Sequence, residues 1–163
     1  MRQWVLIRAQ QIPVLRTLAE FAENFFAPRQ PIGALAIIVN ADGHILIANH
    51  ATRPHEPWGL PGGWLDRCER PEDGVLREVA EELGIPVTLE AYVGSHEHDY
   101  GWLPPRGLTL LFRLATPLTD AGTVRALTWE IAETRWATVE EVCAVVHPRT
   151  AAIVRRAMEV PVA

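Results

Sequence analysis

The chain contains no lysine, so all 15 of its fixed cationic side chains are arginines. It has only two cysteines, Cys68 and Cys143, which are too few for the disulfide framework of a small secreted domain. We expect two reduced thiols without a catalytic role. No apolar run approaches the roughly 18 residues that a membrane span requires, so we predict no membrane partner. The first residues are too polar for a secretory signal, and we therefore expect a cytoplasmic protein.

Positive charge is scarce relative to negative charge. The 15 arginines face 20 acidic side chains, which gives a formal net charge of -5. Affinity for a nucleic-acid backbone grows with the number of cations presented, so this balance argues against binding of long nucleic acid. Small phosphorylated molecules are compatible with it. Without lysine, any phosphate group that is not held by a metal must be held by arginine, histidine or backbone N–H groups.

A length of 163 residues with 48% apolar content suits one domain with a hydrophobic core. Apolar residues at helical spacing predict a helix over residues 12–26, within an N-terminal extension of about residues 1–30. Strands are predicted at 32–39 and 44–48, joined as a hairpin by a turn at 40–43. Further strands are predicted at 87–94, 108–115 and 127–137, a loop at 50–63, and helices at 71–83, after the capping box Thr138 to Glu141, and at 149–159.

The most informative segment runs from residue 63 to residue 85 and reads GWLDRCERPEDGVLREVAEELGI. Pro71, followed directly by two acidic residues, is typical of the first turn of a helix, and Gly84 is typical of a helix end. Between them, apolar side chains recur every four residues, at Val75, Val79 and Leu83. This stripe predicts that one face of the helix packs on a sheet.

Three glutamates of the same helix, Glu78, Glu81 and Glu82, lie off the apolar stripe. Their spacing places Glu78 beside both others, and like charges so placed repel by about 0.2–0.5 kcal/mol per pair. A cation is therefore expected here, and carboxylates without histidine or cysteine suit Mg²⁺ or Mn²⁺ better than zinc. The alternative is a merely solvated acidic face. That alternative does not require the glycine, glutamate and arginine that accompany the three acids at fixed offsets.

These offsets are a glycine at Gly63, a glutamate six positions on, and then the series Arg77-Glu78-Val79-x-Glu81-Glu82-x-Gly84-Ile85. The pattern resembles the signature of the Nudix hydrolases at every defined position. The resemblance covers about residues 32–146 and implies the Nudix fold, an α/β (α+β) architecture with a mixed β-sheet sandwiched between helices. On this basis we expect residues 1–163 to form a single Nudix domain with the N-terminal helical extension.

The resemblance also implies an activity. A Nudix hydrolase cleaves the pyrophosphate linkage of a nucleoside diphosphate linked to another moiety, with a divalent metal, and yields a nucleoside monophosphate and a phosphorylated product. Glu78 and Glu82 would be the catalytic residues. The implied Mg²⁺ or Mn²⁺ ligands are Glu78, Glu81, Glu82 and the carbonyl of Gly62, and Glu69 and Arg77 would pair behind them and support the loop and the helix.

Outside this segment the residues leave alternatives open. Arg53 would contact substrate phosphates or be a solvated surface residue, and the neighbouring His50 is open to the same two interpretations. Trp58 would stack on a base or pack at the sheet edge. Family members often place a general base or a further metal ligand beyond the signature. The candidates are Glu97, Glu130 and Glu133, and we favour Glu130 because its surroundings resemble the family's penultimate strand.

The cluster His96-Glu97-His98-Asp99 carries two histidines that would share a face of a strand and so suggest a zinc site. Its flanks favour an exposed loop instead, and no partner pair of cysteines or histidines is present. A third interpretation is a lid over the substrate that continues to Arg106.

Two other functions fit the same resemblance. One is a non-catalytic nucleotide-sensing Nudix module, although such relatives usually lose carboxylates of the signature and this chain has lost none. The other is an isoprenoid-diphosphate isomerase on the same fold, for which Cys68 and Cys143 are poorly placed. As substrate we expect a small nucleoside diphosphate derivative, such as a nucleotide sugar, ADP-ribose or a dinucleoside polyphosphate. Homodimer formation is left open.

Overall fold

The structure is a computed structural model that describes residues 13–14, 17–18, 21, 30–53, 55–98 and 107–159. It divides the chain into two units, Met1–Gln30 and Pro31–Ala163. In the first unit, the described residues 13–14, 17–18 and 21 are helical, as expected for that part of the segment 12–26. The rest of the predicted helix lies outside the described residues.

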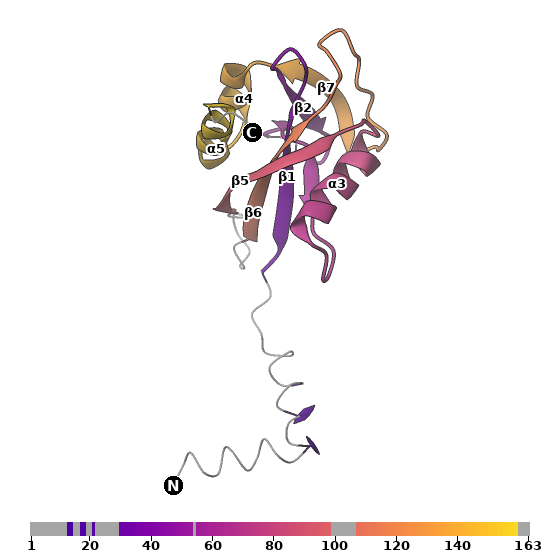
Figure 1. Ribbon diagram of the computed structural model, residues 1–163, viewed down its shortest axis with the longest axis vertical. Coiled ribbons are helices and arrows are strands. Elements are labelled where there is room, and N and C mark those ends of the chain that lie inside the picture. The colour runs from indigo at the N-terminus through magenta and orange to yellow at the C-terminus, as the bar shows by residue number, and fades with distance from the viewer. Residues whose placement is uncertain are drawn as a thin grey trace. The chain divides into compact units, whose positions relative to one another are not determined.

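The second unit is built on a mixed sheet that has seven strands within the described residues (Figure 1). The strands are β1 (Ile32–Val39), β2 (Ile45–His50), β3 (Trp58–Gly59), β4 (Gly62–Trp64), β5 (Thr88–His98), β6 (Gly107–Ala115) and β7 (Ile131–Ala137). The helices are α3 (Pro71–Glu82), α4 (Val139–Val145) and α5 (Pro148–Glu159). None of the helices in the described ranges is long and apolar enough to cross a membrane.

Strand β1 is central and defines the mixed character of the sheet. It runs parallel to β6 along its whole length and antiparallel to β2 and β4 on its other side. Strand β5 pairs antiparallel with β6, and β3 and β7 both pair antiparallel with β2. Successive side chains of β1 point to opposite faces, so each face contributes to a separate core.

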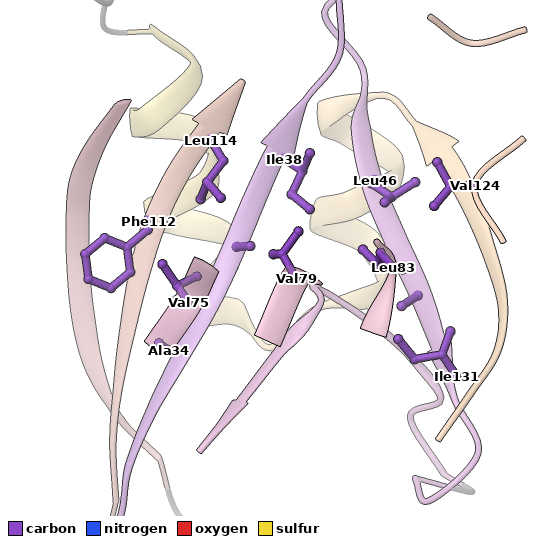
Figure 2. Close-up of a cluster of buried hydrophobic side chains, with 12 residues drawn as sticks. Ala34, Ile38, Leu46, Val75, Val79, Leu83, Phe112, Leu114, Val124 and Ile131 are labelled. Carbon is purple, nitrogen blue, oxygen red and sulfur yellow. The ribbon is translucent and has the colours of Figure 1, made fainter. Parts of the chain in front are cut away.

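Helix α3 covers the first face of the sheet. The predicted stripe of Val75, Val79 and Leu83 is confirmed, since these side chains are at most 3% exposed. They pack against the apolar side chains of the sheet, among them Ala34 and Ile38 of β1 (Figure 2). A period of four residues keeps the stripe on one side of the helix, so α3 is held with its acidic side away from this core.

Helices α4 and α5 cover the second face (Figure 1). Val142 of α4 and Val154 of α5 are fully buried against Ile37 and Ile47 of the sheet. The predicted capping box opens α4: the Thr138 hydroxyl accepts a hydrogen bond from the backbone N–H of the third helical residue, and the carboxylate of that residue accepts one from the Thr138 N–H. This pair fixes where the chain turns from β7 into the helical layer.

Three predictions of secondary structure are wrong in part. The segment 50–63 is not only a loop, because it contains β3 and the beginning of β4, which pair with β2 and β1. Strand β5 extends to His98, four residues beyond its predicted end at 94. Strand β7 begins at Ile131, so residues 127–130 form the turn before it. These boundaries depend on which residues pair with another strand, which local periodicity does not reveal.

Candidate active site

The site is built where the glycines of β4 lie between β1 and helix α3. Leu35 of β1 is opposite Gly62, and Ala34 is opposite Gly63. Gly62 has a φ of +126°, a conformation that favours glycine, and a Cβ there would collide with the Ala34 carbonyl oxygen. A Cβ on Gly63 would lie 2.7 Å from the carboxyl carbon of Glu78. The two glycines therefore allow the backbone of β4 to approach the carboxylates of α3.

Glu82 is the most buried carboxylate of this helix. It is 6% exposed, and its Oε2 accepts a hydrogen bond of 2.9 Å from the Gly62 N–H. Burial raises the pKa of Glu82 to about 7, and the nearby negative charges of Glu78 and Glu130 add to the rise. The Gly62 hydrogen bond and the charge of Arg53 partly oppose it. A buried carboxyl group with such a pKa is more characteristic of a functional site than of a surface helix.

Glu78 lies one turn earlier on α3, with a side chain that is 15% exposed. Burial also raises the pKa of Glu78, although the guanidinium of Arg77 opposes this rise. Arg77 Nη1 donates a hydrogen bond of 2.9 Å to Glu78 Oε1. Two partly desolvated carboxylates thus lie next to a glycine backbone, with Arg77 compensating the charge of Glu78 and Arg53 acting on Glu82.

Arg77 of α3 makes hydrogen bonds to the loop that precedes the helix. Its Nε and Nη2 donate to the two oxygens of Glu69 at 2.8 and 3.0 Å, and its Nη2 also donates to the Trp64 carbonyl at 3.1 Å. These hydrogen bonds lower the pKa of Glu69 to about 2, helped by the Asp66 N–H, and raise the pKa of Arg77 above its usual value. The Glu69–Arg77 pair implied by the resemblance is therefore present. Its supporting role is still a prediction.

Arg77 also reaches the exposed Glu81, whose Oε2 accepts from Nη1 at 3.1 Å. Sequence reasoning did not anticipate that one arginine would pair with Glu69, Glu78 and Glu81 together. Within the described ranges, no group of three or more His, Cys, Asp or Glu side chains is close enough together to hold a metal ion. The metal-ligand set of Gly62, Glu78, Glu81 and Glu82 is thus a prediction.

Two of the predicted residues outside the signature lie close to Glu82. The Ala51 N–H donates to the Glu130 carbonyl at 2.8 Å, which fastens the turn before β7 to the segment that carries Arg53. Glu130 and Arg53 are exposed, and their charges act on Glu82 in opposite directions. The prediction placed Glu130 within a strand over residues 127–137, whereas the structure places it in the turn just before β7. This corrects its position, and its charge still acts on Glu82.

The other two acidic candidates lie elsewhere in the sheet. Glu133 is exposed on β7, opposite Asn49 of β2. Glu97 is exposed on the edge strand β5, which is separated from β1 by β6. Of the three candidates for a base or further ligand, Glu130 is the one whose charge acts on Glu82.

Comparison with known proteins shows the family to which this chain belongs. A family model described as the NUDIX domain matches residues 29–159. The chain belongs to the Nudix family. A MutT-like protein of Streptomyces ambofaciens is 32% identical over 115 residues, which cover 71% of this chain and 68% of that protein. An 8-oxo-dGTP diphosphatase of Proteus vulgaris is 36% identical over 85 residues, covering 51% and 73%.

Among solved structures, the solution structure of the E. coli ORF135 protein superimposes with a TM-score of 0.60 at 26% identity and covers 80% of this chain and 90% of that one. The resemblance and the fold predicted from the sequence are confirmed. The chain is a Nudix hydrolase, and its relatives are named as diphosphatases and pyrophosphohydrolases.

In this Nudix hydrolase, His50 is not an exposed loop residue. It ends β2, is 5% exposed, and its Nε2 lies 3.3 Å from the Leu60 carbonyl oxygen. Burial lowers the pKa of His50 to about 4, and the positive charge of Arg53 contributes. A neutral imidazole at this position can donate a hydrogen bond to the Leu60 carbonyl but is a poor phosphate ligand. Arg53, three residues later, is therefore the better candidate for binding a phosphate.

Trp58 is half-buried and lines a cavity of about 460 Å³ on the second face of the Nudix sheet. The cavity is also lined by Thr109 of β6, His96 of β5, His147 between α4 and α5, and Thr150 of α5. Sequence reasoning missed this group except for Trp58 and His96. Its members come from elements far apart in the chain, and no local pattern marks them.

The predicted exposed loop at residues 96–99 is wrong for residues 96–98, which belong to β5. The ring nitrogens of His96 lie 2.8 Å from the Thr150 hydroxyl and 2.9 Å from the Glu97 carbonyl oxygen, and the ring stacks on His147 with centroids 5.7 Å apart. These contacts give His96 a structural place and do not support the zinc interpretation. Asp99 and the predicted lid over residues 99–106 lie outside the described residues.

Proposed function

We propose that this Nudix hydrolase cleaves the pyrophosphate linkage of a nucleoside diphosphate derivative, with Glu78 and Glu82 as the catalytic carboxylates. The observation that carries the proposal is the close approach of the β4 glycines to the buried Glu82 and the partly buried Glu78, in which the Gly62 N–H donates to Glu82 at 2.9 Å. A diphosphate repels an attacking water because it is negatively charged, so charge neutralisation and orientation are the main tasks of such a site.

The residues present fit a divalent cation. The candidate ligands, the carboxylates of Glu78, Glu81 and Glu82 and the Gly62 carbonyl, are all oxygen donors, which Mg²⁺ and Mn²⁺ prefer. Burial raises the pKa of both Glu78 and Glu82, so their ionised forms lack full compensation without a further cation. When bound, such an ion neutralises phosphate oxygens and lowers the pKa of a bound water.

Three side chains of the protein would have further roles in the reaction. Arg53 is an exposed guanidinium near Glu82 and can bind phosphate oxygens in a bidentate manner. Glu130 is exposed beside the buried carboxylates and is our candidate for the general base that takes a proton from the attacking water. Arg77 would keep Glu69 and Glu78 in register with β4 while the substrate binds.

Small nucleotides are the substrates that these features favour. The similar protein of Proteus vulgaris is named an 8-oxo-dGTP diphosphatase, so nucleoside triphosphates belong beside nucleotide sugars, ADP-ribose and dinucleoside polyphosphates in any test. The isomerase alternative is weakened because Cys143 lies in α4, on the opposite face of the sheet from α3. The sensing alternative predicts binding of a nucleotide without turnover.

The proposal is tested by incubating the protein with this panel in Mg²⁺ and separating the products by chromatography. We expect a nucleoside monophosphate and a phosphorylated second product from at least one compound. The matched control is Glu82→Gln, which keeps the shape of the side chain and should lose most of the turnover. Nucleotide binding without products would favour the sensing module, and isomerised isoprenoid diphosphate would favour the isomerase.

A further inference from the structure

Residues 127–130 form a turn that is bonded at both ends to the surroundings of the proposed catalytic site. At its start, the Leu127 N–H donates a hydrogen bond of 2.7 Å to the carbonyl of Glu82, the last residue of α3. At its end, the Glu130 carbonyl accepts a hydrogen bond of 2.8 Å from the Ala51 N–H. The turn therefore joins the end of the catalytic helix to the segment that follows β2.

The side chain of Leu127 packs against the point where α3 ends. Gly84 has a φ of +61°, and a Cβ there would lie only 2.7 Å from Leu127 Cδ1, so the absence of a side chain leaves room for this contact. The side-chain oxygen of Thr128 is buried and has no hydrogen-bond partner among the described residues. The two backbone hydrogen bonds and the Leu127 contact thus hold the turn in place, and the Thr128 hydroxyl does not.

Trp129 lies inside this turn and contributes little to the core. Its exposed fraction of 78% is the highest of any large hydrophobic side chain that the structure describes. The neighbouring Leu127 is 63% exposed, so the two side chains form a small apolar surface. Core packing is the usual use of a tryptophan, and it does not account for this one. An indole on a turn that is held in place offers a flat surface to a bound molecule.

The flat surface of Trp129 adjoins the residues to which we assign the substrate phosphates. Glu130 follows Trp129 directly, and its charge acts on Glu82, as does the charge of Arg53. Both Glu130 and Arg53 are exposed, so this side of the site is open to solvent. A diphosphate bound at Glu82 and Arg53 would therefore lie next to the turn, and a moiety attached to it can extend along Trp129.

The side chains around Trp129 favour an aromatic ring over a sugar. Leu127 is aliphatic, the Thr128 oxygen is buried, and Glu130 can only accept hydrogen bonds when it is ionised. Such a surface stacks on any base, because stacking does not depend on the groups along the edge of the ring. A sugar gains less from it, since most of its hydroxyls find no partner in the turn and must keep their water.

We propose that Trp129 is a specificity-determining residue that stacks on an aromatic base in the second moiety of the substrate, beyond the pyrophosphate linkage. The inference rests on the proposed function and deepens it. It names as the preferred substrate class the compounds that carry a nucleoside on both sides of the phosphates. Nucleotide sugars and ADP-ribose, which carry a sugar in the second position, are then the poorer substrates.

The test compares two compounds that differ by one base. ADP-ribose carries adenosine on one phosphate and ribose on the other, whereas diadenosine diphosphate carries adenosine on both. We measure kcat/KM with Mg²⁺, and dissociation constants by calorimetry in excess EDTA. The parent protein should prefer diadenosine diphosphate by about 5- to 100-fold, the range expected for one stacked base. Trp129→Ala should abolish this preference and leave the values for ADP-ribose unchanged, and Trp129→Phe should keep most of it.

Thr128→Val is the matched control in the same turn, because it keeps the shape of the side chain and removes a hydroxyl that has no hydrogen-bond partner among the described residues. It should leave the preference unchanged. A urea unfolding curve checks that Trp129→Ala folds like the parent protein, as expected for an exposed side chain.

Three results would overturn the assignment of Trp129. They are equal values for the two compounds in the parent protein, a preference that persists in Trp129→Ala, and a protein that neither binds nor hydrolyses diadenosine diphosphate. Hydrolysis of both compounds at equal kcat/KM refutes the role of Trp129 alone. A binding preference that depends on Trp129, without hydrolysis of either compound, refutes the proposed function alone.

Discussion

At the scale of single residues, Glu82 is the carboxyl group of α3 whose ionised form is most strongly disfavoured by burial. The pKa of about 7 and the hydrogen bond to Gly62 belong to one buried carboxyl group at the end of α3. Glu82→Gln keeps the shape and an oxygen that can accept from Gly62, but removes the charge. We expect turnover to fall by 10²-fold or more, the usual loss for one major electrostatic stabiliser.

The control for this variant is Glu72→Gln on the same helix. Glu72 lies in the first turn, its side chain is 44% exposed, and its nearest ion-pair partner is Arg70 at 3.9 Å. The turnover of Glu72→Gln should stay within a few fold of that of the parent protein. Steady-state kinetics on both variants checks the assignment, and equal losses at the two positions would show that the carboxylates are wrongly assigned.

Arg53 is our proposed ligand of the substrate phosphates, because it is exposed and charged, whereas the neighbouring His50 is buried and has a lowered pKa. Arg53→Ala should raise KM more than it lowers kcat, since binding common to the ground state and the transition state is lost first. Arg155→Ala, an exposed arginine on α5, is the matched control. Measurement of both constants decides the role, and an unchanged KM would return Arg53 to the solvated surface.

At the scale of elements, the local patterns predicted α3 well and the short strands badly. Helix α3 was predictable because Pro71, Gly84 and the apolar stripe all lie within the helix or at its ends. Strands β3 and β4 have two and three residues, too few for a periodic pattern, and form only because β1 and β2 lie beside them. The length of β5 was missed because register shifts interrupt its alternation. The cavity was missed because it joins residues from distant elements.

The same strand β4 gives a prediction that separates function from stability. In Gly63→Ala the new methyl group would meet the end of the Glu78 side chain, which can move, so activity should fall strongly while the unfolding midpoint changes little. In Gly62→Ala the methyl group meets the Ala34 backbone at a φ that disfavours alanine, and we expect a loss of roughly 1–3 kcal/mol in stability as well. Urea denaturation and kinetics on both variants test this. Similar stability losses in the two would contradict the described packing of β4.

At the scale of the whole molecule, the buried His50 couples folding to pH. Its pKa is about 4 in the folded protein against 6.5 in an unperturbed histidine, so below pH 6.5 the unfolded chain binds a proton that the folded chain does not. Stability should therefore be unaffected by this group above about pH 6.5 and fall as pH drops toward 4, by at most about 3 kcal/mol. Urea denaturation of the parent protein and of His50→Gln across this pH range isolates the effect. The difference between their free energies of unfolding should become smaller as the pH falls. A constant difference would show that His50 titrates normally.

Metal removal should separate the activity of the molecule from its fold. The packing of Val75, Val79 and Leu83 against the sheet involves no carboxylate, and Arg77 pairs with Glu78 and Glu81. The protein should therefore stay folded in excess EDTA while turnover disappears.

Mg²⁺ that binds only the folded state should then raise the free energy of unfolding, by about 2.7 kcal/mol at 100 times its Kd. Thermal melts with and without Mg²⁺ measure this shift, and Glu82→Gln should reduce it. Turnover that persists undiminished in EDTA would reject a metal-dependent mechanism. A chain that unfolds in EDTA would show that the apolar core is not stable enough to hold the repelling carboxylates together without a metal ion.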